Sequence, residues 1–447
     1  MRKPKRTTVV PGPKSSAIFS AEQKNLAPGL QGFALMAGVA MEKGEGSWLT
    51  DVDGNEYIDF IGGIGVNGLG HSHPKYVKAL QEQLAKISVG TFTSRSRAEL
   101  VAKVAEHAPG KIDQLQLYSG GAEAVESAMR LAKCYTGKWE FLSLWGGFHG
   151  KTLGVMGLLG DGQKAKYGPF APGCHTLPAF PDCYRCPLGK QPDSCAMACV
   201  DMFEKSARTQ TTGAIAAVIV EPCQGTAGNI VPPKGWLKAM QEATKRLGAL
   251  LICDEMITGF GRTGSFFVSD DFGVEPDIIT VGKSFGGGFP VSGVLTTSEI
   301  AQAKPWSNPS GSSSSYGGNP LAATAALTTI KVIEEEKLCE NSARMGERLL
   351  GHLQRFKEKF EFVGEVRGKG LFLGLELVKD RQTKEPVSEA RMKEFYKEGV
   401  SRGILAMSYK PTIRLQPSLN IDADTVDAGC EILEGMFADM AAKGDWR

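Results

Sequence analysis

The chain has 447 residues, of which 42% are hydrophobic and 22% charged, and 51 Lys and Arg residues balance 49 Asp and Glu residues to a net charge of +2. This composition is typical of a globular protein and excludes extensive disorder. The balanced charge argues against binding to nucleic acid or a membrane surface, because both need a pronounced basic excess or stripe. We therefore expect a small molecule as the partner.

Residues 1–18 are expected to form a mobile N-terminal arm. Pro4, Pro11 and Pro13 argue against a helix there, and no apolar run follows the basic residues, as it would in a signal peptide. The longest apolar stretches are far shorter than the roughly 18 residues of a membrane-spanning helix. We expect a cytoplasmic protein whose residues 19–73 pack with a smaller C-terminal domain.

Residues 74–325 alternate helical patterns with short apolar runs. Pro74 begins an amphipathic helix, and Ser96 with Glu99 has the capping-box spacing of a second one. The runs expected to be strands are 114–118, 141–144, 215–220, 250–253 and 278–281. Strands that are apolar on both faces and separated by helices predict a mostly parallel sheet, so we expect a large α/β domain. Ligands of such sheets bind beyond the carboxyl ends of the strands.

Residues 326–447 have a different character and are expected to form a smaller α+β domain. A long helical pattern at 320–336 crosses the start of this domain, and a second one lies at 340–359. Strands are expected at 371–378, 404–407 and 412–415.

Two charged residues lie at the ends of expected strands. Lys283 comes after the apolar run 278–281, where desolvation would lower its pKa and make it a Schiff-base nucleophile, although a solvated loop lysine is the commoner case. Asp254 follows the run 250–253, so its carboxylate needs a partner. That partner could be the ring N–H of a pyridinium, a helix N-terminus or a structural ion pair.

Two further strand ends carry residues suited to a phosphorylated heterocycle. Gly120 and Gly121 lie between a strand and a helix, where free backbone N–H groups favour phosphate, although such turns also occur without a ligand. Phe148, followed by His149, could stack on a flat ring or could simply pack in the core. A phosphate cradle, a stacking ring, a carboxylate and a lysine together are the groups needed to hold pyridoxal phosphate.

The motifs of the chain resemble those of the class III aminotransferases, which are fold-type I enzymes and include 4-aminobutyrate and ornithine aminotransferases. The resemblance covers residues 45 to about 440, and its most specific block runs from Asp254 to Lys283. It is carried by the segments 118–124, 148–152, 219–222, 254–264, 283–288, 316–320, 366–370 and 413–417. It implies a large domain with a mostly parallel sheet, a smaller C-terminal domain and pyridoxal 5′-phosphate as the cofactor.

The resemblance implies a role for each matching residue. Lys283 would be the Schiff-base lysine and proton shuttle, and Asp254 the partner of the pyridinium nitrogen. The remaining cofactor contacts would come from Gly120, Gly121, Ala122, Phe148, His149, Glu221 and Met256. Ser315 stands where the family has a Thr that reaches the phosphate of the neighbouring subunit, which implies a homodimer.

Substrate binding is implied for three residues. Arg414 resembles the arginine that binds the substrate α-carboxylate, and Glu221 the residue that can cover this arginine. Lys151 stands where 4-aminobutyrate and ornithine enzymes have an Arg for a distal carboxylate. Because a lysine is a poorer bidentate clamp than an arginine, 4-aminobutyrate is only weakly supported as the substrate.

Cysteines crowd into the expected insert 174–199. The spacing Cys183-x2-Cys186-x8-Cys195-x3-Cys199 could build a structural four-thiolate zinc or iron–sulfur site, but reduced thiols or labile disulfides are also compatible with it. We assign no metal ligand from the sequence.

Transfer of an amino group from an amine or amino acid to a 2-oxo acid is the expected reaction. Racemases, epimerases, aminomutases, decarboxylases and lyases share the superfamily, and the motifs do not separate them reliably. A binding protein on a former enzyme fold is disfavoured by the intact Lys283, Asp254 and Arg414.

Overall fold

A computed structural model describes residues 2–162, 164–170, 173–178 and 180–447. Met1 of the expected arm and Ala179 of the cysteine-rich stretch lie outside the described residues. The chain divides into two compact units, one formed by Met1–Pro74 with Lys337–Arg447 and the other by Lys75–Glu336.

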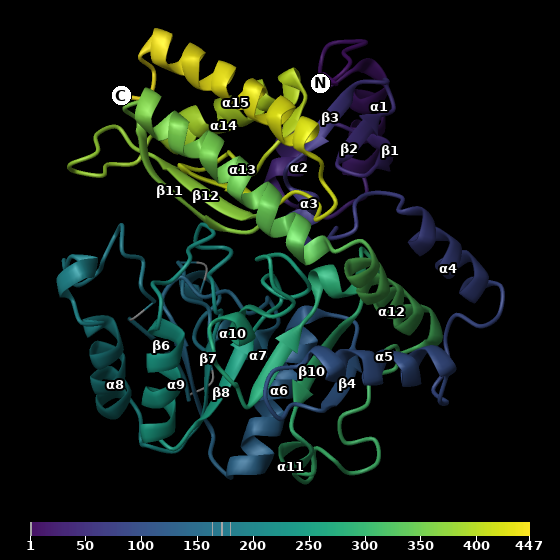
Figure 1. Ribbon diagram of the computed structural model, residues 1–447, viewed down its shortest axis with the longest axis vertical. Coiled ribbons are helices and arrows are strands. Elements are labelled where there is room, and N and C mark those ends of the chain that lie inside the picture. Colours follow the sequence, from purple (N-terminus) through teal and green to yellow (C-terminus); the bar gives the residue numbers. More distant parts are fainter. Residues whose placement is uncertain (1, 163, 171–172, 179) are drawn as a thin grey trace. The chain divides into compact units, whose positions relative to one another are not determined.

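The unit of Lys75–Glu336 is built on a sheet in which the described residues form seven strands, in the order β4-β10-β9-β8-β7-β5-β6 (Figure 1). Neighbours from β6 to β9 are parallel, whereas β10 runs antiparallel to both β9 and β4. The strands are β4 (Gln114–Tyr118), β5 (Glu140–Leu144), β6 (Cys174–Leu177), β7 (Ile215–Val220), β8 (Leu250–Asp254), β9 (Ile278–Val281) and β10 (Ser292–Thr296). The expected mostly parallel sheet is confirmed.

Helices surround this sheet, and α6 packs across β7 to β10 (Figure 1). The helices are α4 (Pro74–Leu84), α5 (Arg95–His107), α6 (Gly121–Thr136), α7 (Leu153–Met156), α8 (Ala198–Gln210), α9 (Trp236–Arg246), α10 (Val268–Asp271), α11 (Ser298–Ala301) and α12 (Pro320–Glu335), with 3₁₀ turns η1 (Lys164–Lys166), η2 (Pro192–Ser194) and η3 (Lys283–Gly286). Every residue of β5, β7, β8 and β9 is buried, which explains their near-continuous apolar sequences.

The other unit, Met1–Pro74 with Lys337–Arg447, contains two smaller sheets among its described residues, ordered β1-β2-β3-β13 and β11-β12-β14. Among the described strand pairs of this unit, β13 with β3 is parallel and the others are antiparallel. The strands are β1 (Met41–Glu45), β2 (Trp48–Asp51), β3 (Glu56–Asp59), β11 (Val363–Lys369), β12 (Phe372–Leu377), β13 (Ile404–Leu405) and β14 (Thr412–Leu415). The helices are α1 (Pro13–Gln23), α2 (Gly32–Ala37), α3 (Gly62–Gly65), α13 (Leu338–Lys359), α14 (Glu389–Arg402) and α15 (Ala423–Lys443).

The N-terminal prolines do not prevent a helix, so that part of the expectation for residues 1–18 is wrong. Helix α1 begins at Pro13, where proline is favoured because the first helical N–H has no partner within the helix. The backbone N–H groups of Lys14 and Ser15 donate to the carboxylate of Asp53, at 2.9 and 2.8 Å.

Three boundaries differ from the expected ones. The cap of α5 is Ser94, whose side chain accepts from Arg97 N, whereas Ser96 donates to the Pro320 carbonyl. Strand β6 occupies the first four residues of the stretch expected to be a cysteine-rich insert. The division between the units falls at 336/337, after α12, which packs on α5 and η3 of the sheet unit, and not at 325/326.

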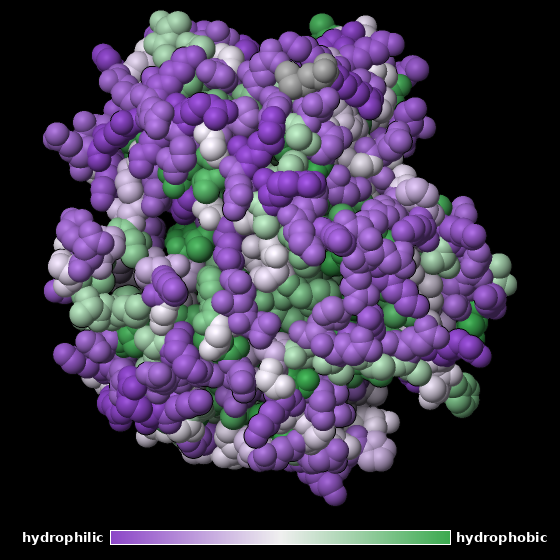
Figure 2. All heavy atoms as spheres, viewed as in Figure 1, coloured by the Kyte–Doolittle hydropathy of each residue, from purple (hydrophilic) through white to green (hydrophobic). Residues whose placement is uncertain are grey.

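Hydrophilic residues cover most of the face seen in Figure 2. None of the described helices has the length and apolar character that crossing a membrane requires.

A carboxylate clamp joins α13 and α15. Arg348 donates to both oxygens of Asp427 at 2.7 and 2.5 Å, and His352 Nε2 lies 2.9 Å from Oδ1. The hydrogen bonds from Arg348, aided by His352, lower the pKa of Asp427 to about 2. Because this folded-state value lies below the unfolded value of about 3.9, the stabilisation is present above pH 4 and is lost as the pH falls toward 2.

Asp427→Asn is predicted to lower the free energy of unfolding by about 1 kcal/mol at pH 7, and progressively less below pH 4. Urea unfolding of the two proteins as a function of pH measures the difference. Glu434→Gln is the control, because it removes a more exposed, single contact with Lys359 between the same helices. An Asp427→Asn deficit that stays constant from pH 7 to pH 3 would contradict the assignment.

Candidate active site

Five chain segments that carry the expected site residues meet at one end of the strands of the seven-stranded sheet. Parallel β5, β7, β8 and β9 end there, and β4 ends at the same edge because it lies across β10 from β9. Tyr118 pairs with Ser292, and Val281 with the adjacent Gly293. The residues that follow these strands are therefore brought together by topology.

The N-terminus of α6 lies beyond β4. The Glu123 carboxylate turns back to accept from the N–H groups of Ser119 and Gly120, at 3.2 and 3.3 Å. The next N–H groups, of Gly121 and Ala122, belong to the first turn, where no partner within the helix is available. Ser292 Oγ donates to the Gly120 carbonyl at 2.8 Å and fixes this turn to β10.

Asp254 and His149 form a buried pair. His149 Nδ1 lies 2.7 Å from Asp254 Oδ2, and their side chains are 1% and 2% exposed. A carboxylate can only accept, so Nδ1 is the donor. Asp254 Oδ1 accepts from Met256 N at 3.1 Å. Each carboxylate oxygen thus has one donor and retains capacity for another, while His149 Nε2 is buried without a partner among the described residues.

Glu221 is a second buried carboxyl group beside this pair. It follows Val220, which pairs with Cys253, so it lies level with Asp254 in the sheet. Its oxygens accept from Phe148 N at 2.8 Å and Gly225 N at 2.9 Å. Burial raises the pKa of Glu221, against the opposing effect of His149. Glu221 thereby fixes the backbone that carries Phe148, which is half-buried.

The turn between β5 and Phe148 depends on residues that the sequence did not reveal. Gly146 N donates to the Gly160 carbonyl at 2.9 Å, and Gly160 N donates to the Gly147 carbonyl at 2.8 Å. Gln224 Nε2 donates to the Trp145 carbonyl at 2.8 Å. A Cβ on Gly160 would lie 2.3 Å from Leu144 O and 2.4 Å from Gly146 N. Gly160 stands in no recognisable motif, so no sequence signal could have identified it.

Lys283 follows β9 at the start of η3 and has φ = +47°, an unfavourable conformation for a residue with a side chain. Three residues before it, Thr280 pairs with Asp254. Met256 packs against both neighbouring segments, since its Sδ would lie 2.7 Å from a Cβ on Gly282 and 3.2 Å from one on Gly121. Met256 therefore lies between Gly282, the residue before Lys283, and Gly121 at the start of α6.

The other expected site residues are placed as follows. Lys151 and Ser315 are exposed on the sheet unit. Arg414 lies on β14 of the other unit, where it is half-buried and pairs with Gly374 of β12.

The four clustered cysteines line one small cavity and are free thiols. Burial, aided by the neighbouring thiols, raises the pKa of Cys183 to about 11, and a raised pKa disfavours the reactive thiolate. Within the described ranges, no three His, Cys, Asp or Glu side chains are placed to hold a metal ion.

The arrangement fits pyridoxal phosphate. The open first turn of α6 offers N–H groups to a phosphate, and the Asp254 carboxylate retains acceptor capacity in a buried place where a cationic ring nitrogen would compensate its charge. Lys283 provides an amine at the same edge.

Comparisons with known proteins agree with this chemistry. The sequence pattern of the class III aminotransferases matches residues 33–437. The chain is 36% identical to a leucine/methionine racemase of Thermococcus litoralis, over 90% of this chain and 91% of that protein. It is also 36% identical to a 5-aminovalerate aminotransferase of Pseudomonas aeruginosa, over 90% of this chain and 94% of that protein.

Solved structures give the same result. An omega transaminase of Pseudomonas jessenii in complex with PMP superposes with a TM-score of 0.88 at 28% identity, covering 95% of this chain and 98% of that one. The expected fold type and the expected pyridoxal phosphate dependence are confirmed.

Gly160→Ala is predicted to destabilise the protein by about 1–3 kcal/mol, because its Cβ would meet backbone atoms that cannot move independently. Gly162→Ala is the matched control, since a Cβ there meets no atom of the described residues within 4 Å. Urea unfolding of both variants measures the effect. Equal stabilities of the two variants would show that the Gly146–Gly160 contact is absent.

Proposed function

The chain belongs to the class III aminotransferase family, and we propose that it transfers an amino group from an amine or amino acid to a 2-oxo acid. The observation that carries the proposal is the buried His149–Asp254 pair at the sheet edge that also bears Lys283. When bound, pyridoxal phosphate supplies an aldehyde for the amino group and an electron-withdrawing ring that stabilises negative charge on the substrate carbon.

Asp254 would hold the ring nitrogen in its protonated form. Its free acceptor capacity and its burial suit it to a cationic N–H group. His149 orients Asp254 through the 2.7 Å contact, and the Met256 N–H fixes the other oxygen. The carboxylate is therefore held in one orientation before the cofactor arrives.

The first turn of α6 would hold the phosphate through the N–H groups of Gly121 and Ala122. The helix dipole adds a favourable interaction with the anion. Gly120 would contribute backbone atoms beside this turn, where a Cβ on Gly120 would make an ordinary contact with Glu123 Cβ at 3.9 Å among the described residues. Phe148 and Met256 would contact the ring.

Lys283 would move the proton at the substrate carbon. A neutral amine at this position can accept a proton from one carbon and return it to another as an ammonium. The strained backbone at Lys283 supports a functional constraint on its position.

Arg414 would bind the carboxylate of an amino acid substrate or of the 2-oxo acid, as a guanidinium can do with two parallel hydrogen bonds. Glu221 would adjust access to this arginine, and Lys151 would contribute a single charge toward longer substrates.

A homodimer is proposed as the active assembly. Large apolar side chains are exposed in the segment 77–92, among them Leu84 at 61%, Ile87 at 53% and Phe92 at 88%. Tyr316, next to Ser315, is 65% exposed. Exposed apolar side chains gathered in one segment are typical of an interface, and Ser315 would reach the phosphate site of the second copy.

Racemisation is the second candidate. The relatives of similar identity include the Thermococcus litoralis racemase as well as the aminotransferase. In a racemase the substrate keeps its amino group, and a proton returns to the opposite face of the same carbon.

The test is the absorbance of cofactor-loaded protein mixed with single amines or amino acids in the absence of any 2-oxo acid. We expect the near-visible band to disappear with the correct donor and to return when pyruvate or 2-oxoglutarate is added. Lys283→Ala is the control and should show no such cycle.

A band that recovers without an acceptor, while the optical rotation of the amino acid is lost, would replace the proposal with racemisation. No band after incubation with pyridoxal phosphate would overturn both candidates.

A further inference from the structure

A cluster of buried hydroxyl groups joins β4, α6 and the loop between α11 and α12. Tyr118 Oη lies 2.5 Å from Ser127 Oγ and 3.0 Å from the Ser312 carbonyl, and it also contacts Ser312 Oγ. Ser127 Oγ lies 3.2 Å from Ser312 Oγ. Tyr118, Ser127 and Ser312 are 2%, 0% and 7% exposed.

Every member of this hydroxyl cluster, Tyr118, Ser127 and Ser312, can be satisfied. Trp306 Nε1 can only donate, and it donates to Ser127 Oγ at 3.0 Å. Ser127 can then donate to Tyr118 Oη, Tyr118 to the Ser312 carbonyl, and the Ser312 hydroxyl to Ser127 Oγ. A buried network with all its donors used is rigid and specifies one arrangement.

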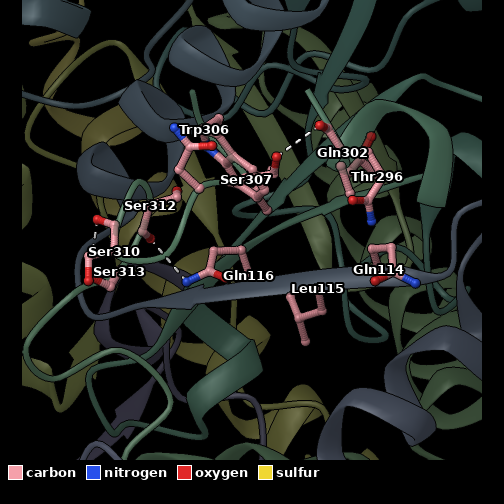
Figure 3. Close-up of a pocket in the computed structure, with 13 residues that line it drawn as sticks. Gln114, Leu115, Gln116, Thr296, Gln302, Trp306, Ser307, Ser310, Ser312 and Ser313 are labelled. Carbon is pink, nitrogen blue, oxygen red and sulfur yellow. Dashed lines mark hydrogen bonds between the residues drawn. The ribbon is translucent and has the colours of Figure 1, made fainter. Parts of the chain in front are cut away.

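The same loop has further attachments. Gln116 Nε2 donates to the Ser312 carbonyl at 3.1 Å, and Arg130 on α6 donates to the Gly311 carbonyl at 3.1 Å. Figure 3 shows Gln116, Trp306 and Ser312 among the residues that line a cavity. The cavity has a volume of about 350 Å³ and is also lined by Val294 and Thr296 of β10. These hydrogen bonds, together with the hydroxyl cluster, attach the loop at Gly311 and Ser312 to β4 and α6.

The loop leaves β4 after Ser312 and contacts it again at Gly317, after the four residues 313–316. Gly317 packs so tightly that a Cβ would lie 2.2 Å from the Leu117 carbonyl oxygen, and a Cβ on Gly318 would lie 2.9 Å from Leu117 Cδ1. Between these attachments the segment 313–316 projects from the strand, and Ser315 within it is exposed. Its position is therefore set by Ser312 on one side and by Gly317 on the other.

We propose that the hydroxyl cluster fixes the position of Ser315, so that Ser315 contacts the cofactor phosphate of a second copy of the chain. Tyr118 and Ser127 lie on the strand and helix that form one phosphate site, and Ser312 leads to the segment that serves the other. This inference rests on the proposed function and on the proposed dimer.

The test is a double-mutant cycle on the dissociation constant of pyridoxal phosphate, measured by absorbance titration of the full-length protein. Ser315→Ala should raise the constant about tenfold, as expected for loss of one hydrogen bond to a charged group. Tyr118→Phe, which removes only the hydroxyl, should raise it about threefold to fivefold. The double variant should resemble Ser315→Ala alone, because Tyr118 acts only through Ser315.

Tyr135→Phe is the matched control, because it removes a tyrosine hydroxyl from the exposed end of the same α6, where it bonds Glu299. It should leave the dissociation constant unchanged. Ser127→Ala is a second variant in case Tyr118→Phe does not fold, and it should act in the same direction.

A purely structural role would lower the melting temperature of the Tyr118 variant but leave its affinity for the cofactor within twofold, and that result would overturn the inference. Additive effects of the two substitutions, or no effect of Ser315→Ala, would also overturn it. Failure of the unaltered protein to bind the cofactor would instead contradict the proposed function.

Discussion

The burial of the Asp254 carboxylate is the constraint on which the rest of the candidate site depends. A carboxylate that is 2% exposed needs donors, and the described residues supply two, His149 Nδ1 and Met256 N. The remaining acceptor capacity, together with the unpartnered His149 Nε2, leaves an incompletely compensated polar region at a sheet edge. A cationic heterocycle would complete it, and Lys283 lies three residues beyond the partner of Asp254 in the neighbouring strand.

The turns around this carboxylate hold its neighbours in place. Glu221 accepts from two backbone N–H groups and fixes the Phe148 turn, while Gly160 supports the same turn through hydrogen bonds with Gly146 and Gly147. Ser292 fixes the Gly120 turn in a similar way. The turns at the strand ends are therefore held by hydrogen bonds to their backbone, from the Glu221 and Ser292 side chains and from the backbone of Gly160.

The sequence predicts the buried strands and the residues at their ends well, because continuous apolar runs and the polar residues after them are local features. Strands β7 and β9 have the expected bounds. The sequence does not predict strand β6 (Cys174–Leu177). It lies at the edge of the sheet, three of its residues are half-buried, and it has no apolar run.

Contacts between residues far apart in the sequence could not be predicted. Ser312 contacts Tyr118 and Ser127, which lie more than 180 positions earlier in the sequence. The Gly160 contact spans a shorter distance but stands in no motif that would predict it. Likewise Pro13 was taken as a helix breaker, although at the first helical position it favours a helix.

The central claim is that this sheet edge presents Lys283 to pyridoxal phosphate. The most direct measurement is borohydride reduction of the cofactor-loaded protein, followed by proteolysis and mass spectrometry of the peptides. We predict one phosphopyridoxyl group per chain, attached to Lys283. Attachment to another lysine, or no attachment to protein that holds the cofactor, would contradict it.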